Sequence, residues 1–321
     1  MYVKDALLEQ HLIYGTMGIG GEWNPKITIT DKDIRDAAYA IDAALEAGIR
    51  FFDLADIYRY GKSEEVFGVY LKEHPDIREK IIIQSKAGIM LDAVPAGSCF
   101  NFSYEHIVKS VDGILNRLGI EYLDILLLHR PDPLLEREGI KRAMDELFAE
   151  GKIRALGVSN MDYHQIQLLE AYTGRKIVAN QLELSLLKTD FVSSAIGFNN
   201  HNGRNLDFQL GTLEYCMLNN VSLQSWGPLA RGIYSGAPLD ENTPRAVIKT
   251  KEIVERIAED RNVSAEAVVL AWILRHPAKI NPVIGTTNPQ RIKNAADAFK
   301  VNMTRYEWYE LLDASMGKPS P

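Results

Sequence analysis

The sequence predicts a (β/α)8 TIM barrel, and three observations lead to this fold class. Eight short apolar runs alternate with segments of helical period along the 321 residues. The runs are apolar at successive positions rather than at every second one, as expected for strands of a parallel sheet that is covered on both faces. Several runs end on polar side chains, and a parallel barrel gathers the ends of its strands at one mouth.

The eight runs give the order of the expected strands. They are Leu12–Gly18, Ile49–Ala55, Lys80–Lys86, Tyr122–His129, Lys152–Asn160, Lys176–Ser185, Val221–Gly227 and Asn281–Thr287. An open, doubly wound α/β sheet is the alternative fold. We favour the barrel because no GxGxxG motif follows the first run.

Apolar residues three or four positions apart indicate the helices between these strands. The first expected helix, Asp31–Ala47, has such a pattern and is followed by Gly48 as a stop signal. The others are Tyr104–Leu118, Ile140–Glu150, Tyr163–Tyr172, Thr212–Asn219, Lys249–Asp260, Ala265–His276 and Gln290–Ala298.

Three long loops interrupt this alternation: Ala87–Asn101, Leu187–Gly211 and Ala230–Arg245. They follow the third, sixth and seventh expected strands, so all three leave the same end of the barrel. Long loops at a barrel mouth usually serve binding. No internal repeat or inter-domain linker stands out, and we therefore expect residues 1–321 to form a single domain.

Composition narrows the choice of compartment and partner. Lys plus Arg (36) against Asp plus Glu (43) gives a net charge of −7, which argues against nucleic acid as the main partner. Two cysteines are too few for a disulfide framework or a cysteine-based metal site, and they favour a reducing compartment. The N-terminal residues do not resemble a signal peptide, and no apolar run has the length of a membrane span. We expect a cytoplasmic protein that has no metal and no membrane partner.

Four polar residues lie at or just after the ends of three expected strands: Asp53, Tyr58, Lys86 and His129. A lysine ammonium beside a phenol favours the phenolate and lowers the phenol pKa from its usual value of about 10. An aspartate would hold the lysine charged, and a histidine can donate a hydrogen bond to a substrate oxygen. The set indicates protonation of an oxygen that gains charge when a nicotinamide delivers hydride to a carbonyl carbon.

Three of these residues also have a structural interpretation. Asp53 can cap a turn, Lys86 can be a solvated strand end, and His129 can be a loop histidine. Asp56 is a competing carboxylate. Joint placement at consecutive strand ends is what favours the functional interpretation.

The motifs around these residues resemble those of the aldo-keto reductase superfamily. In order they are Gly15–Gly18, Phe51–Gly68, Ser85–Gly88, Leu126–Pro133, Gly151–Asn160, Asn180–Ser185, Ser225–Gly232 and Ile284–Ile292. Each is modest alone, but the ordered series is highly specific and covers nearly the whole chain. The resemblance implies a (β/α)8 barrel that binds NADPH and reduces a small-molecule aldehyde or ketone. It also implies a catalytic tetrad of Asp53, Tyr58, Lys86 and His129, and it leaves the oligomeric state open.

The resemblance implies the cofactor contacts as well. Ser159, Asn160 and Gln181 correspond to residues that hold the nicotinamide carboxamide, and Trp226 takes the place of a stacking tyrosine. Thr286, Thr287 and Arg291 correspond to the 2′-phosphate site, where a guanidinium can bind phosphate bidentately. Leu229 and Gly232 lie in the loop that backs the pyrophosphate. Gly15, Thr16, Met17 and Gly227 complete the expected contacts, and Met17 and Trp23 are candidate walls of the substrate site.

The sequence departs from the family pattern near the tyrosine and near the phosphate. The family commonly has glycine directly after the catalytic tyrosine, whereas here Arg59 and Tyr60 intervene, so Tyr60 rivals Tyr58. Tyr58 is preferred because it keeps the family's five-residue step from Asp53. Gly285 and Ala295 replace a common lysine and asparagine, which leaves the strength of NADPH preference over NADH open.

Two other functions fit parts of the pattern. A Schiff-base aldolase would use Lys86 as its nucleophile in the same fold, but it leaves the cofactor motifs unexplained. A regulatory barrel would hold NADP(H) with little turnover, and the intact tetrad argues against it.

Overall fold

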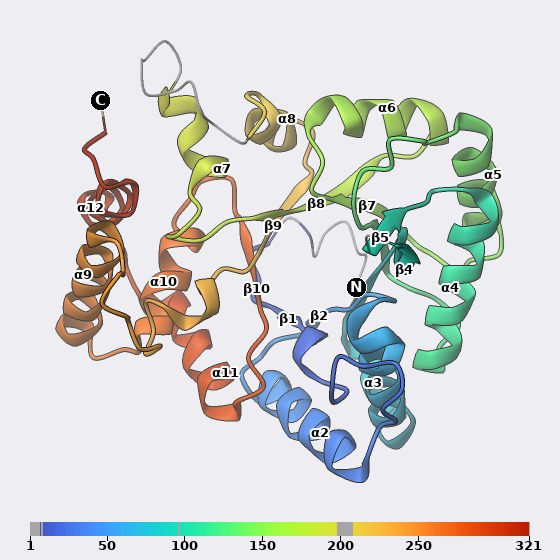
Figure 1. Cartoon of the computed structure of the whole chain (residues 1–321), viewed down its shortest axis with the longest axis horizontal. Coiled ribbons are helices and arrows are strands. Elements are labelled where there is room, and N and C mark those ends of the chain that lie inside the picture. The colour runs from blue at the N-terminus through green and yellow to red at the C-terminus, as the bar shows by residue number, and fades with distance from the viewer. Residues whose placement is uncertain (1–6, 8, 96, 198–207, 321) are drawn as a thin grey trace.

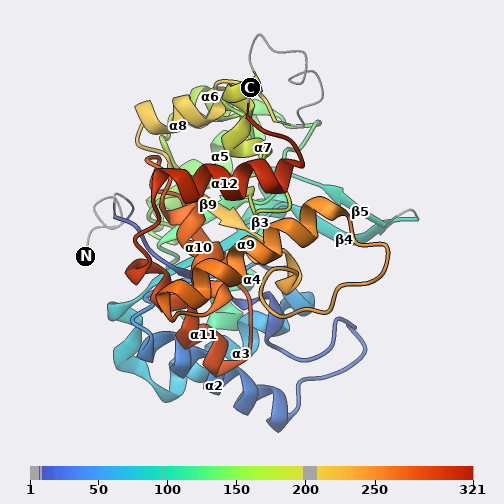
Figure 2. The same ribbon diagram turned by 90° about the vertical axis from the view of Figure 1, so that its left-hand side faces the viewer.

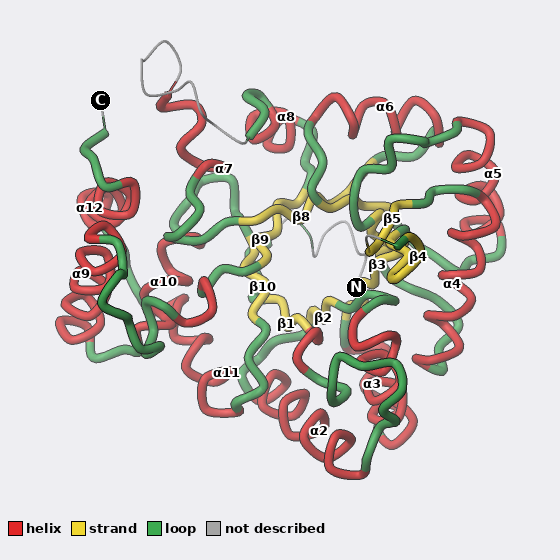
Figure 3. Tube along the Cα trace, viewed as in Figure 1, coloured by secondary structure: helices red, strands yellow, loops and turns green. Residues whose placement is uncertain are grey.

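The computed structural model describes residues 7, 9–95, 97–197 and 208–320, and it confirms the predicted (β/α)8 barrel. Eight parallel strands close into a ring in the order β1-β10-β9-β8-β7-β6-β3-β2 (Figures 1 and 3). Their bounds are β1 Ile13–Gly15, β2 Phe51–Asp53, β3 Ile82–Ala87, β6 Ile125–Leu128, β7 Leu156–Ser159, β8 Ile177–Glu183, β9 Ser222–Trp226 and β10 Asn281–Ile284. All eight expected strands are present, and each is shorter than the apolar run that predicted it.

Helices cover the outside of the ring. They are α2 Asp31–Glu46, α3 Lys62–Glu73, α4 Tyr104–Leu118, α5 Arg137–Ala149, α6 Tyr163–Thr173, α7 Asp190–Ser193, α8 Thr212–Leu218, α9 Arg245–Arg261, α10 Ala265–Leu274, α11 Pro289–Ala296 and α12 Arg305–Met316. Helices α3, α7 and α12 are additions to the predicted set. A capping box at Thr304 and Glu307 begins α12, and this signal was present in the sequence.

The prediction of a plain loop at Ala87–Asn101 was wrong. This segment contains an antiparallel hairpin of β4 (Ile89–Val94) and β5 (Gly97–Phe100). Figure 2 shows the hairpin on the same side of the barrel as the loop that leads into α9. In the expected loop Leu187–Gly211, α7 and a short 3-10 helix (Ser194–Gly197) follow β8, and residues 198–207 lie outside the described residues.

The barrel interior changes from apolar to polar along the strands. Side chains alternate between the interior and the helices, so every second residue of a strand points inward. Phe51 and Ile82 belong to the apolar cluster at the start of β2 and β3. Two residues further along each strand, Asp53 and Gln84 are buried polar side chains that meet inside the barrel. This second layer leads into the mouth, where the strands end.

Helices α3 and α4 approach each other closely at Gly68. A Cβ atom on Gly68 would lie 2.2 Å from the carbonyl oxygen of Arg117. This approach brings Arg117, in the last turn of α4, onto Glu64 of α3, with Nε 2.8 Å from Oε2. The position of α3 matters for the site because the turn that carries Tyr58 leads directly into it. Among the described residues, no helix combines the length and the apolar character needed to cross a membrane.

We predict that Gly68→Ala destabilises the protein by about 1–3 kcal/mol, because the new methyl group must displace backbone of α4. Gly139 is the matched control, since it is also a helix-interior glycine and its nearest contact to an added Cβ is 3.5 Å. Gly139→Ala should be neutral or stabilising by up to about 1 kcal/mol. Urea denaturation followed by circular dichroism measures both changes. Equal effects of the two substitutions would contradict the close approach.

Candidate active site

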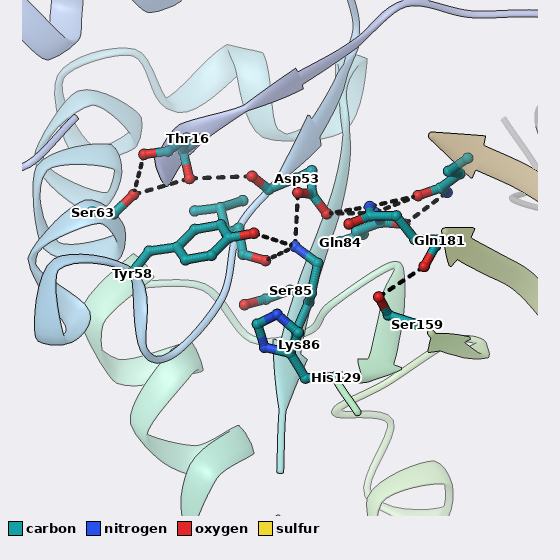
Figure 4. Close-up of polar contacts among 12 residues, drawn as sticks. Thr16, Asp53, Tyr58, Ser63, Gln84, Ser85, Lys86, His129, Ser159 and Gln181 are labelled. Atoms are coloured by element: carbon teal, nitrogen blue, oxygen red, sulfur yellow. Dashed lines mark hydrogen bonds and ion pairs between the residues drawn. The ribbon is translucent and has the colours of Figure 1, made fainter. Parts of the chain in front are cut away.

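Strands β2 and β3 place an acid and an amine side by side inside the barrel (Figure 4). Lys86 Nζ lies 2.7 Å from Asp53 Oδ2, and the two side chains are 0% and 2% exposed. An ammonium group buried to this extent requires a counter-charge. Removing one partner of such a pair typically costs about 3–5 kcal/mol. The pair predicted from the strand ends is therefore present and structurally required.

All three hydrogens of the Lys86 ammonium are used. Besides Asp53, the ammonium donates to the carbonyl oxygen of Leu54 at 2.9 Å and to Tyr58 Oη at 2.9 Å. Because Tyr58 Oη accepts this bond, its own hydrogen is free to point elsewhere. The arrangement holds the phenol oxygen against a positive charge and leaves the phenol able to donate its proton.

Burial acts in opposite directions on the pKa values of Tyr58 and Lys86, and it determines the net direction only for Tyr58. Burial raises the pKa of Tyr58 above its ordinary value, while Lys86 opposes that rise. For Lys86 the burial effect would lower the pKa, but the Asp53 and Tyr58 interactions outweigh it and leave the pKa raised. The sequence analysis expected a lowered phenol pKa, and the structure gives the opposite net direction. Tyr58 is thus a neutral phenol and Lys86 a cation at neutral pH.

His129 lies beside Tyr58 just beyond the end of β6, with ring centroids 6.1 Å apart and ring planes at 80°. Burial, Lys86 and Arg130 hold the pKa of His129 well below 6.5, so the imidazole is neutral. Its Nδ1 is buried and has no hydrogen-bond partner among the described residues. A neutral imidazole carries one N–H group, which can donate to an oxygen of a bound molecule.

The structure separates Tyr58 from its rival. Tyr60 donates from Oη to Asp92 Oδ2 on the β4–β5 hairpin at 2.9 Å, whereas Tyr58 holds the bond with Lys86. Arg59, Tyr60 and Gly61 all have positive φ angles of 53°, 60° and 87°. This left-handed conformation costs energy in residues other than glycine and is frequent at functional sites. The turn aims the two tyrosines at different partners.

Asp56, the competing carboxylate, belongs to a different cluster. Its Oδ1 is buried without a hydrogen-bond partner among the described residues. Burial and the neighbouring Glu64 carboxylate raise the pKa of Asp56 to about 7. Glu64 itself is fully buried, accepts a hydrogen bond from Ser85 Oγ and pairs with Arg117. Asp53 rather than Asp56 is therefore the partner of Lys86.

Two functional candidates were missed by the sequence analysis: Gln84 on β3 and Gln224 on β9. Both are fully buried, and together with Gln181 they form a hydrogen-bonded group around Asp53. A signal for them existed in the sequence. Gln84 lies two residues before Lys86, so the alternation of strand side chains places both on the interior face.

Comparison with known proteins identifies the family. A model of the aldo/keto reductase family matches residues 11–315. The chain belongs to this family. A 6-dehydroglucose reductase of Agrobacterium fabrum is 37% identical, with 98% of this chain and 97% of that protein covered. A 6-dehydroglucose reductase of Novosphingobium aromaticivorans is 32% identical, with 89% of this chain and 88% of that protein covered. A crystal structure of a thermostable aldo-keto reductase with the inhibitor epalrestat superposes with a TM-score of 0.72 at 25% identity, covering 94% of each chain.

As an aldo-keto reductase, the protein is an oxidoreductase that transfers hydride between a nicotinamide cofactor and the carbonyl group of a small molecule. The polar groups expected to hold the carboxamide are connected in the structure. Ser159 Oγ donates to the Gln181 carbonyl at 2.8 Å, and Asn160 Nδ2 donates to Ser159 Oγ at 2.8 Å. Trp226 Nε1 donates to Asn160 Oδ1 at 3.0 Å. Asn160 Oδ1 has a second lone pair, with which it can accept a hydrogen bond from a carboxamide NH2 group.

The residues at the end of the first strand that were predicted to contact the cofactor include one that is buried, Thr16, and one that is exposed, Met17. Thr16 is fully buried, and its Oγ1 donates to the Asp53 carbonyl oxygen at 3.2 Å. Ser63 of α3 donates to the carbonyl oxygen of Thr16 at 2.7 Å, so Thr16 connects Asp53 to α3. Met17 is 53% exposed and accepts from Arg59 through its carbonyl oxygen. A Cβ on Gly15 would lie 2.9 Å from Val283 Cγ1, which explains glycine there by packing.

The residues predicted for the 2′-phosphate site lie just before α11 and in its first turn, which contains Arg291. Arg291 Nε lies 2.7 Å from Glu266 Oε1, and Nη2 donates to the carbonyl oxygen and the hydroxyl of Ser235 at 3.0 and 3.1 Å. Its Nη1 has no partner among the described residues. Thr287 is exposed beside this turn, and Thr286 is half-buried. An arginine anchored on two sides at a helix N-terminus suits a phosphate group.

The remaining predicted contacts lie in the loop after β9. Leu229 precedes a short 3-10 helix, Ala230–Gly232, and Gly232 has a φ of 83°. A Cβ on Gly232 would lie 3.4 Å from Arg291 Nη2, so this loop and the Arg291 turn are neighbours. Gly227 also has a left-handed φ, of 65°, and it faces open space.

A cavity of about 550 Å³ opens at the mouth between the ends of β6, β7, β8 and β9. Arg130, Asn160, Glu183, Lys188, Gln209 and Trp226 are among its lining residues. None of the described residues forms a hydrogen bond or an ion pair with the charged end of Arg130 or Glu183. Arg130 directly follows His129, so this polar cavity borders the proposed catalytic residues.

We predict that Asp56→Asn raises the melting temperature at pH 8 but much less at pH 5. The folded-state pKa of Asp56, about 7, lies above its ordinary value of 3.8, so folding is favoured by protonation. The stability that this group contributes is complete below pH 3.8 and is lost as pH rises through about 7. Asparagine mimics the protonated form and should recover a few degrees (about 2–4 °C) at pH 8. A gain that is the same at both pH values would contradict the assignment.

Proposed function

We propose that this aldo-keto reductase transfers hydride from NADPH to the carbonyl carbon of a small aldehyde or ketone, with Tyr58 as the proton donor. The observation that carries the proposal is the hydrogen bond from Lys86 Nζ to Tyr58 Oη, 2.9 Å long, inside the buried pair with Asp53. It leaves the phenol hydrogen free and places a cation where the phenolate will form. Bound NADPH supplies the hydride that the side chains cannot provide.

The four residues of the proposed tetrad have separate roles in proton transfer. The substrate oxygen gains negative charge as the carbonyl carbon accepts hydride, and Tyr58 gives that oxygen its proton. Lys86 stabilises the resulting phenolate, and Asp53 keeps Lys86 charged and in place. Neutral His129 donates a hydrogen bond to the same oxygen. The raised pKa of Tyr58 ensures that the phenol is protonated when substrate binds.

The polar cavity beside His129 supports a substrate that carries polar groups. Arg130 and Glu183 face it without partners in the described part of the chain, and each can bind a hydroxyl group. Two of the relatives are named 6-dehydroglucose reductase. We therefore propose hydroxyl-bearing aldehydes as the first substrates to assay.

The geometry also weighs against the rival functions. A Schiff-base aldolase needs a neutral lysine with a free lone pair. Lys86 donates all three of its hydrogens and has a raised pKa, so it is unsuited to act as a nucleophile. A regulatory barrel has no need for a proton donor of this kind, and the assembled tetrad therefore favours turnover.

The choice of NADPH over NADH rests on Arg291. Its guanidinium is held by Glu266 and Ser235 close to the N-terminus of α11, so little side-chain entropy remains to be lost when a phosphate binds. Glu266 partly offsets the positive charge. The proposed preference for the 2′-phosphate therefore depends on Nη1 and on the α11 N-terminus together.

We predict that Tyr58→Phe lowers kcat for carbonyl reduction by at least about 10²-fold, because general acid catalysis is typically worth 10²–10⁴-fold. The substitution removes only the hydroxyl group, so folding and NADPH binding should persist. Tyr60→Phe is the matched control, since it removes a hydroxyl that contacts Asp92 and not Lys86. The measurement is the loss of NADPH absorbance with an aldehyde panel. If Tyr58→Phe reduced carbonyl compounds at the wild-type rate, Tyr58 would not be the proton donor and the proposed mechanism would be wrong.

We predict that Arg291→Ala weakens NADPH binding by about ten- to hundredfold and NADH binding by far less. A charge-assisted hydrogen bond of this kind is worth roughly 1.5–3 kcal/mol. Titration of tryptophan fluorescence with each cofactor measures the two dissociation constants. Arg261→Ala is the control, because that arginine pairs with Glu307 on the outer helices. Equal affinity of wild type for NADPH and NADH would sink the phosphate assignment.

A further inference from the structure

Three glutamines from three strands surround Asp53 inside the barrel. Gln84 Nε2 donates to Asp53 Oδ1 at 2.6 Å, and Gln181 Nε2 donates to the same oxygen at 3.0 Å. Figure 4 shows Gln84 and Gln181 reaching this carboxylate while Lys86 holds its other oxygen. None of the four polar side chains, Gln224 included, is more than 2% exposed.

Gln224 closes the group from the far side. Its Oε1 accepts from Gln84 Nε2 at 2.7 Å and from Gln181 Nε2 at 2.9 Å. Its own Nε2 donates to Gln84 Oε1 at 3.0 Å. Gln84 and Gln181 therefore each use both hydrogens of the amide, one on Asp53 and one on Gln224.

The carboxylate determines which way every amide points. An ionised carboxylate only accepts hydrogen bonds, so Gln84 and Gln181 must turn their NH2 groups toward Asp53. Their second hydrogens then require an oxygen, which fixes Gln224 with Oε1 toward them. Reversing any one of these amides would bring two oxygens or two NH2 groups together in a buried space, where an unmet polar group costs about 1–3 kcal/mol.

The side-chain oxygen of Gln181 takes no part in the hydrogen bonds among Asp53 and the three glutamines. With its NH2 group held by Asp53 and Gln224, Gln181 must turn Oε1 away from both of them. Gln181 is also the residue that the proposed function assigns to the carboxamide of the cofactor. An oxygen presented there can accept only from the NH2 group of that carboxamide.

We propose that Gln84 and Gln224 are positioning residues that connect the Asp53–Lys86 pair to the nicotinamide site. They lock the Gln181 amide so that its oxygen accepts from the carboxamide NH2. The same carboxylate thus orients the proton-transfer side through Lys86 and the hydride-transfer side through Gln181. This inference rests on the proposed function for the role of Gln181.

The test measures binding and needs no turnover. NADP+ is compared with its 3-acetylpyridine analogue, which has a methyl group in place of the carboxamide NH2, by titration of tryptophan fluorescence. In wild type the missing hydrogen bond should weaken the analogue by about fivefold, since one neutral hydrogen bond is worth about 1 kcal/mol. In Gln224→Met, Gln181 loses one of its two acceptors, and the ratio should fall toward one.

Gln84→Met is the sharper variant, because Gln84 contacts Asp53 and Gln224 but forms no hydrogen bond with Gln181. A reduced ratio in this variant requires transmission through the group. Asn281→Leu is the matched control. Asn281 is a buried amide on β10 in register with Gln224, but it bonds Ser222 and the His11 backbone instead. Its substitution should leave the ratio at the wild-type value.

Two results would overturn the inference. One is a wild-type ratio near one, which is informative even if neither methionine variant folds. The other is a wild-type ratio retained in both methionine variants, which reduces Gln84 and Gln224 to structural filling. A failure of the proposed function looks different: wild type would bind NADPH and reduce no carbonyl compound, whatever the ratio of the two oxidised cofactors.

Discussion

The charge of Lys86 is the constraint on which the rest of the site depends. An ammonium group with no exposed surface loses its hydration, and the chain must replace that hydration with fixed acceptors. Asp53, the Leu54 carbonyl oxygen and Tyr58 supply three acceptors in the directions that the ammonium hydrogens require. Two of these partners come from β2 and its end, so the pairing of β2 with β3 determines the chemistry of the site.

The same requirement spreads into the barrel. One oxygen of the Asp53 carboxylate pairs with Lys86, and the buried second oxygen also needs hydrogen-bond donors. Two glutamine amides supply them. The interior thus holds an apolar layer at the start of the strands and a hydrogen-bonded polar layer below the mouth. The polar layer is stable because the side-chain amide hydrogens of Gln84 and Gln181 all have acceptors, on Asp53 and on Gln224.

The sequence predicted the barrel and the four catalytic candidates because continuous apolar strands and polar strand ends are local patterns. The residues Gln84 and Gln224 were missed because their interactions come from other strands: Gln84 on β3 contacts Asp53 of β2, and both glutamines contact each other across the barrel. The pairing of Arg291 with Glu266 joins α11 to α10 and likewise has no local signal. The hairpin in Ala87–Asn101 was taken for a loop because its residues are half-buried or exposed and lack a continuous apolar run.

The turn after Tyr58 has a consequence for how this enzyme can change. Arg59 donates to the Met17 carbonyl and lies over the Trp23 ring, while Tyr60 holds Asp92 of the hairpin. The two residues that separate Tyr58 from Gly61 therefore connect two mouth loops to the turn that carries Tyr58. A sequence change in either loop therefore acts on this turn through a contact with Arg59 or Tyr60. A replacement hairpin keeps this connection only if it supplies another acceptor for Tyr60 in place of Asp92.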